Sequence, residues 1–243
     1  MTKQIVFLVV LLLTLGVFAF TVRRYIVFFR VTRKDFPVKE IGRRIGVMLR
    51  VAIGQTKIFR RPVSGLLHAL VFWGFCVILI GSIEMVVDGL AGTERAFAPL
   101  GIVYDVIMAS GDIFAMIISI AILIFLARRL FLNVRRFKGV EMRHISHLDA
   151  NVALTMILLL MITLLGMNTF YIHTAQGAGH SIEGVYPVSR IMAGLIDAGS
   201  GANETWYQIH WWGHIVLIFV FANYLPYSKH FHVFLSVPNV FLS

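Results

Sequence analysis

The chain has a single cysteine among its 243 residues, Cys76, which lies inside an apolar stretch. One cysteine excludes a disulfide within the chain, a cysteine-ligated Fe–S cluster and a Cys-x-x-Cys-His haem attachment site. We therefore expect no Fe–S cluster in this chain. Any haem that it binds is non-covalent and held by histidine or methionine.

Charged residues are also scarce, at 14% of the chain, and only 12 of them are acidic. The sequence contains no Gly-rich phosphate loop, no Ser-His-Asp order and no cluster of carboxylates. The usual sequence signals of phosphate-binding and hydrolytic sites are thus missing. Internal repeats and low-complexity segments are absent as well.

Apolar residues, in contrast, make up 58% of the chain and include 20 Phe, which excludes a soluble domain. A helix needs about 20 apolar residues to cross a hydrocarbon core of roughly 30 Å. Five stretches are long enough, near residues 5–22, 64–88, 102–127, 150–171 and 206–227. We predict an all-α membrane protein in which a five-transmembrane-helix bundle forms a single domain over residues 1–243.

The basic residues predict the orientation, because short loops rich in Lys and Arg stay in the cytoplasm. Twelve of the 22 lie within residues 23–61 and six within 128–143. We therefore expect an outside N-terminus, cytoplasmic loops at 23–63 and 128–149, a cytoplasmic C-terminus, and a multi-pass location in a bacterial inner membrane. The net charge of +10 then faces anionic membrane lipid or a cytoplasmic partner, and nucleic acid is not an expected partner.

Two connections are too long to lack structure. Apolar residues recur at helical spacing among basic ones over 38–53, which predicts an amphipathic helix lying in the membrane interface. The Gly-rich outer connection, 174–205, is predicted to cap the outer ends of the helices.

His214 and His232 lie 18 residues apart across the last apolar stretch. This is five turns of a continuous helix, so both rings would leave one face about 27 Å apart. Such a pair suits two metal centres stacked across a membrane, with other helices supplying the second ligands. Pro226 lies between them and predicts a kink. A modest kink leaves His232 facing the bundle, whereas a kink that starts an interfacial helix lowers the depth of His232 and recruits His230 in its place.

His68 is the expected partner of His232, because it lies near the cytoplasmic end of the second stretch without a polar neighbour in sequence. Ionisable groups inside a membrane need partners and mark functional sites by default. The structural alternative is a histidine hydrogen-bonded to a neighbouring helix.

His173, at the outer end of the fourth stretch, is the expected partner of His214. An interfacial histidine beside an aromatic belt is the alternative for His173, and an open or water-ligated iron is the alternative for His214. His210 and His230 are the alternates for the two sites.

Other polar residues near the membrane faces are candidates for supporting roles. Arg60, Arg61 and Arg128 are placed to balance haem propionates at the inner face, although each could simply enforce topology. A quinone site needs a group that exchanges protons with the ring oxygens. The candidate acids are Asp105, Asp112 and Glu84, and helix-to-helix polar contacts are the alternative for each.

Three motifs resemble the membrane domain of the respiratory nitrate reductase gamma subunit. The resemblance is closer to the membrane domains of electron-transfer-flavoprotein:menaquinone oxidoreductases and heterodisulfide-reductase-like Fe–S oxidoreductases. The motifs are RP at 61–62 followed by LHALVFWGF at 67–75, then WWGH at 211–214, and YLPYSKHFH at 224–232 running to PNVF at 238–241. Together with the five predicted spans, they cover essentially the whole chain.

The resemblance implies a transmembrane b-type cytochrome that passes electrons between a membrane quinone, expected to be menaquinone, and a cytoplasmic Fe–S or flavoprotein partner. By motif, His68, His214 and His232 match axial haem ligands, so two haems b are expected. The chain departs from the pattern at Ile78, where the gamma subunit has a second ligand on this span. Relatives also continue past PNVF into a cysteine-rich Fe–S domain, so we expect that function from another chain or from sequence beyond Ser243.

A second function class fits the same composition. The chain would then be a haem-free membrane anchor that docks a cytoplasmic redox enzyme through its basic loops, and it would not itself take part in electron transfer.

Overall fold

The computed structural model describes residues 2–31, 38–132 and 144–243, and helices are the only regular elements in these ranges. Five helices are long and apolar enough to cross a membrane, which confirms the five predicted spans. They are α1 (Thr2–Val31), α3 (Pro62–Ala91), α4 (Ile102–Leu130), α5 (His144–Gly177) and α7 (Ser200–Tyr224).

Short helices occupy the connections. Those on the N-terminal side are α2 (Ile41–Met48), the π-helical turn η1 (Leu49–Ile53), and the 3₁₀ turns η2 (Ile58–Arg60) and η3 (Ala98–Leu100). Those on the C-terminal side are α6 (Pro187–Ala193), the 3₁₀ turns η5 (Leu225–Tyr227) and η6 (Lys229–Phe231), and α8 (His232–Leu242).

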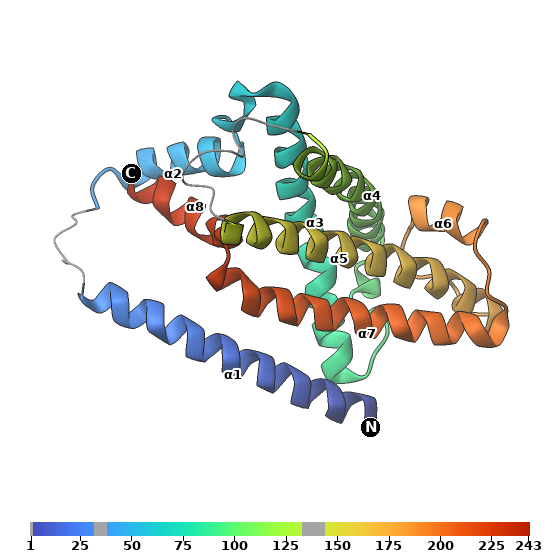
Figure 1. Cartoon of the computed structure of the whole chain (residues 1–243). Helices are drawn as coiled ribbons and strands as arrows, with labels where there is room; N and C mark the ends of the chain where they lie inside the picture. The colour runs from blue at the N-terminus through green and yellow to red at the C-terminus, as the bar shows by residue number, and fades with distance from the viewer. Residues whose placement is uncertain (1, 32–37, 133–143) are drawn as a thin grey trace.

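The long helices pack mainly as two pairs, α5 with α7 and α3 with α4, and α4 joins the pairs through α5. Helix α8 lies beside α2 at one end of the bundle and α6 lies at the other (Figure 1). We name these the α8 end and the α6 end. The start of α3, the end of α4 and the end of α7 belong to the α8 end.

Close approach of α5 and α7 depends on a residue without a side chain. A Cβ atom at Gly166 on α5 would overlap the ring of His210 on α7. The same ring lies 5.4 Å from the ring of Phe170, measured between centroids. The His210 side chain therefore packs between these two helices.

Helix α1 lies at the edge of the bundle and is held by few contacts. Phe7 is fully buried, and its ring fills the notch that Gly89 leaves on α3. At the α8 end, the Tyr25 hydroxyl donates to the Pro226 carbonyl. Most other α1 side chains are exposed, and Phe20 retains 67% exposure, as suits a helix that faces lipid.

Two of the differences between the observed and the predicted helix boundaries have a clear physical cause. Helix α1 continues through Arg23 and Arg24 to Val31, because backbone hydrogen bonds do not require apolar side chains. Helix α7 ends at Tyr224 and Pro226 lies in a 3₁₀ turn, so one continuous helix from His214 to His232 was a wrong expectation. The proline ring lacks an N–H and clashes with the carbonyl one turn back, which stops the helix.

Candidate functional site

His68 and His232 meet at the α8 end, although 163 residues separate them in the chain. His68 lies on the second turn of α3 and His232 is the first residue of α8. The ring centroids are 6.0 Å apart, with 39° between the ring planes. The structure therefore brings this predicted pair together despite the break in the last helix.

The spacing of this pair suits a shared metal ion. Because an imidazole nitrogen binds a metal at about 2 Å, two rings on opposite sides of one ion have centroids roughly 6 Å apart. His232 Nδ1 lies 2.9 Å from the Lys229 carbonyl oxygen, which can only accept, so Nδ1 carries the proton and Nε2 keeps its lone pair. Such a backbone contact is typical of metal-ligating histidines.

His68 has spare hydrogen-bonding capacity. The side chain is half-buried, and its Nδ1 is a buried atom with no partner in the described part of the chain. Unsatisfied buried polar atoms are rare in native proteins, and a bound group is one explanation for them. No set of three or more metal-ligating side chains occurs in the described residues, but a haem iron needs only two axial ligands. The pair fits that group.

His230 remains the alternate for this pair. Its ring centroid lies 6.0 Å from that of His232, and its Nδ1 lies 3.2 Å from Ser228 Oγ. Burial lowers the pKa of His230, and the neighbouring His232 lowers it further. A neutral ring with an available nitrogen is therefore favoured at neutral pH.

The turn that carries both C-terminal histidines is tied to α5 by Asp149. Its carboxylate accepts from the Lys229 amide at 3.0 Å and from the Tyr224 hydroxyl. This anchor fixes where α8 begins and so positions His232. The sequence analysis missed Asp149, because nothing in the local pattern indicates a partner 80 residues away.

The predicted propionate partners also lie at the α8 end. Arg60 and Arg61 are exposed just before α3, and Arg128 is half-buried in the last turn of α4. Their placement agrees with a role beside the histidine pair, and that role stays a prediction.

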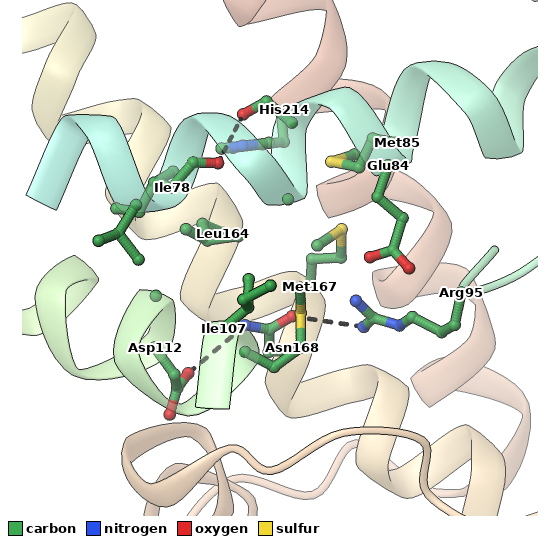
Figure 2. Close-up of a pocket in the computed structure, with 15 residues that line it drawn as sticks. Ile78, Glu84, Met85, Arg95, Ile107, Asp112, Leu164, Met167, Asn168 and His214 are labelled. Atoms are coloured by element: carbon green, nitrogen blue, oxygen red, sulfur yellow. Dashed lines mark hydrogen bonds between the residues drawn. The ribbon is translucent and has the colours of Figure 1, made fainter. Parts of the chain in front are cut away.

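A small cavity lies between α3, α4, α5 and α7 in the half of the bundle towards α6 (Figure 2). The space in which the centre of a water molecule fits is about 40 Å³, and one water needs about 10–15 Å³ of such space. Apolar side chains form most of the wall. His214, Glu84, Arg95, Asp112 and Asn168 bring polar groups to it.

His214 is held in one tautomer at this cavity. The side chain is 2% exposed. Its Nδ1 lies 3.0 Å from the Leu160 carbonyl oxygen and 3.0 Å from Thr163 Oγ1. Because the carbonyl can only accept, Nδ1 carries the proton. Nε2 therefore keeps a lone pair, and no described residue hydrogen-bonds to it.

The structure does not bring His173 to His214. His173 Nε2 lies 2.8 Å from the Ile196 carbonyl oxygen in the connection between α6 and α7. It follows Thr163, the neighbour of His214, by ten residues on α5, a rise of about 15 Å. The alternate His210 bonds to the Trp206 carbonyl at 2.8 Å and packs on Gly166. Neither ring lines the cavity.

The predicted quinone-site acids are placed as anchors of the α6 end. Asp112 is 1% exposed and accepts from the amides of Val188 and Ser189 at 2.7 and 3.0 Å, which ties down the start of α6. The amide of Phe97 and the hydroxyl of Tyr104 lie 3.0 and 3.2 Å from the carboxylate oxygens of Glu84.

Asp105 lies in the first turn of α4 and does not line the cavity. An acid at this position stabilises a helix N-terminus. A quinone role for Asp105, Asp112 or Glu84 stays a prediction.

Arg95 is a residue that the sequence analysis did not select. Its guanidinium lies over the ring of Tyr171 at 4.3 Å and reaches Asn168 Oδ1 at 3.4 Å, and Asn168 in turn reaches Asp112 (Figure 2). Burial raises the pKa of the nearby Tyr186 to about 12, so this phenol stays neutral. The available signal was that Arg95 and Arg190 are the only Lys or Arg residues in the two connections predicted to lie outside.

The chain is similar to two known oxidoreductases. It is 25% identical over 245 residues to a probable iron-sulfur-binding oxidoreductase, FadF, of Bacillus subtilis, covering 99% of this chain and 33% of that protein. It is 21% identical over 213 residues to the EtfAB:quinone oxidoreductase of Syntrophomonas wolfei, covering 82% of this chain and 28% of that protein. The similarities support an oxidoreductase-related family.

The chain spans about a third of the length of these relatives. No family model matches the chain, and no solved structure matches it.

Proposed function

We propose that the chain is a transmembrane b-type cytochrome of a bacterial inner membrane. In this proposal it passes electrons between a membrane quinone, menaquinone, and a cytoplasmic Fe–S or flavoprotein partner. The α8 end faces the cytoplasm. The chain is then the membrane electron-transfer part of a quinone oxidoreductase.

The single observation that carries the proposal is the facing pair of His68 and His232. His68 and His232 would hold the haem, which would supply one-electron exchange. Because both histidines would be used to hold it, electron transfer is favoured over activation of dioxygen. The protein's contribution is to place the two rings and to fix the tautomer of His232 through the Lys229 carbonyl.

The surface of the α8 end supports the proposed orientation. Exposed cations precede α3 at Arg50, Lys57, Arg60 and Arg61, as expected of a cytoplasmic face. They also offer a charged surface to an acidic electron partner.

Helix α2 supports the predicted interfacial helix. Ile41, Ile45 and Leu49 are 56%, 41% and 51% exposed, and they recur every fourth residue on one face of α2 and the turn that follows it. An apolar stripe left uncovered by the protein suits burial in the lipid boundary.

The relatives support the choice of partners. One is named for iron-sulfur binding and the other for quinone and EtfAB. Because this chain covers about a third of each, we assign the iron-sulfur or flavin chemistry to a partner or to a further domain. Menaquinone reduction linked to electron-transfer flavoprotein is the reaction that we propose for the assembly.

A reduced-minus-oxidised absorbance spectrum of the purified protein, produced with haem supplied, tests the proposal. We expect b-type bands, and we expect His68→Ala to remove them because one of two axial ligands is lost. His180→Ala is the matched control, since His180 is exposed in the outer connection, and it should keep the bands. A wild-type protein without b-type bands would instead support the haem-free membrane anchor.

A further inference from the structure

The cavity beside His214 does not fit a haem held by two histidines. Among the described residues that line it, His214 is the only histidine, and Ile78 lies on the facing helix α3. A second axial histidine is therefore missing from the described lining. We propose that this cavity instead receives the head group of a quinone, with His214 and Arg95 at the two ring oxygens. The inference rests on the proposed function, because a bound quinone needs the haem held by His68 and His232 as its electron donor or acceptor.

His214 supplies the hydrogen-bond acceptor. Its Nδ1 is committed to the Leu160 carbonyl and to Thr163, so Nε2 presents a lone pair that no described residue uses. A hydroquinone hydroxyl can donate to this nitrogen. The fixed tautomer prevents the ring from offering a proton at Nε2 without becoming charged.

Arg95 supplies the hydrogen-bond donors. A guanidinium has five N–H donors and no acceptor. The Arg95 guanidinium makes a long hydrogen bond to Asn168 and lies over the faces of Tyr171 and Tyr186, at 4.3 and 5.2 Å. It also interacts electrostatically with the Glu84 carboxylate, which accepts its hydrogen bonds from Phe97 and Tyr104. Aromatic faces hold the cation in place without using its N–H groups along the ring plane. A quinone carbonyl can accept from them.

The two groups approach the cavity from different elements, His214 from α7 and Arg95 from the connection between α3 and α4 (Figure 2). A quinone has an oxygen at each end of one ring, and each oxygen alternates between carbonyl and hydroxyl. One acceptor and one donor on separate walls match the reduced form, in which one hydroxyl can donate to His214 and the oxygen of the other can accept from Arg95. Neither a water cluster nor an apolar ligand requires this pairing.

The walls can open for a flat ring. Three thioethers, Met85, Met108 and Met167, line the cavity, and methionine side chains repack easily around ligands. On α3, Gly81 and Ser82 line the cavity and are also half-exposed on the bundle surface. This side gives a lipid-dissolved molecule a way in.

Binding of a short-tailed naphthoquinol to the full chain in detergent, measured by calorimetry, tests the assignment. We expect His214→Leu and Arg95→Leu each to raise the Kd about tenfold or more, the value of one lost hydrogen bond to a buried or charged group. His214→Gln keeps a carbonyl acceptor and should recover part of the affinity. His210→Gln, one turn away and outside the cavity, is the matched control and should bind normally.

A steric variant gives an independent measurement. A Cβ at Gly111 meets nothing within 4 Å and Gly111 lines the cavity, so Gly111→Leu adds bulk where the protein has space. We expect it to block naphthoquinol binding while the b-type spectrum persists.

Haem content separates this inference from the proposed function. We expect about one haem per wild-type chain and the same ratio in His214→Leu. A ratio near two that falls to one in His214→Leu would overturn the inference and restore an outer haem. Unchanged naphthoquinol affinity in all three cavity variants would also overturn it. A wild-type chain without haem would refute only the proposed function, since the binding measurement does not need haem.

Discussion

The polar side chains at the two ends of the bundle differ in burial and in how many hydrogen-bond partners they have. At the α6 end, His214 is 2% exposed, Asp112 and Glu84 are 1% exposed, and the carboxylates accept from neighbouring backbone amides. At the α8 end, His232 is exposed and His68 is half-buried with an orphaned Nδ1. At the α6 end the buried carboxylates anchor the connections, and the unused hydrogen-bonding capacity belongs to His214 Nε2 and the Arg95 guanidinium at the small cavity. At the α8 end the unused capacity belongs to the pair of His68 and His232, which is the better candidate for holding a haem.

The two ends also differ in what their anchoring aspartates hold in place. Asp112 and Asp149 each tie a short segment to a long helix, one at each end. The segment held by Asp149 carries a candidate haem ligand, because Asp149 binds the Lys229 amide and Lys229 lies three positions before His232. The segment held by Asp112 carries none of the candidate ligands. Variants at the two ends should therefore fail in different ways.

The largest effect is expected at the α8 end from His232→Ala. Loss of an axial ligand should reduce bound haem to about a tenth of wild type or less, because removal of mere supporting contacts at metal sites already costs about 10–100-fold in affinity. His230→Ala should keep most of the haem. The ratio of haem to protein, by absorbance, measures both, and the reverse pattern would make His230 the ligand.

An intermediate effect on stability is expected from Asp112→Ala. It leaves the amides of Val188 and Ser189 without their acceptor inside the protein, which costs roughly 2–5 kcal/mol of unfolding free energy. Asp149→Ala should cost only about 1 kcal/mol, since water reaches that half-buried site, yet it should loosen haem. Chemical denaturation in micelles compares the two. Equal stability losses would contradict the contrast between the ends.

The smallest effect is expected from Thr163→Val. It removes one of two contacts to His214 Nδ1, and the Leu160 carbonyl still fixes the tautomer. The loss should stay under about 1 kcal/mol, with naphthoquinol affinity changed less than about threefold. A larger change would show that the hydroxyl, and not the carbonyl, sets the proton position on the ring.

Hydropathy was sufficient to predict the five spans, because lipid-facing side chains such as those of α1 must be apolar whatever their neighbours are. It was also sufficient to place His68 and His232 at one depth. The sequence left open whether Pro226 bends the helix or begins a new interfacial one, since that outcome depends on the partners available to the freed carbonyls. For Tyr224 and Lys229 the partner is Asp149, which lies on another helix.

The α6 end was less predictable from sequence. His173 was expected at the depth of His214, but the structure puts it about 15 Å further along α5 than Thr163, the neighbour of His214. Its ring bonds to the Ile196 carbonyl. Asp112 and Glu84 were correctly placed on their helices, while their partners come from connections whose path no periodicity encodes.

The separation of His68 from His232 along the chain has a consequence for synthesis. His68 enters the membrane with the second span, whereas His232 follows the fifth, so a ribosome must translate 163 intervening residues before the pair can exist. A cofactor that needs both rings is loaded only after all five helices have been inserted. Loading would then report that the chain has been assembled in full, and a truncated product would be left with a lone ring in lipid.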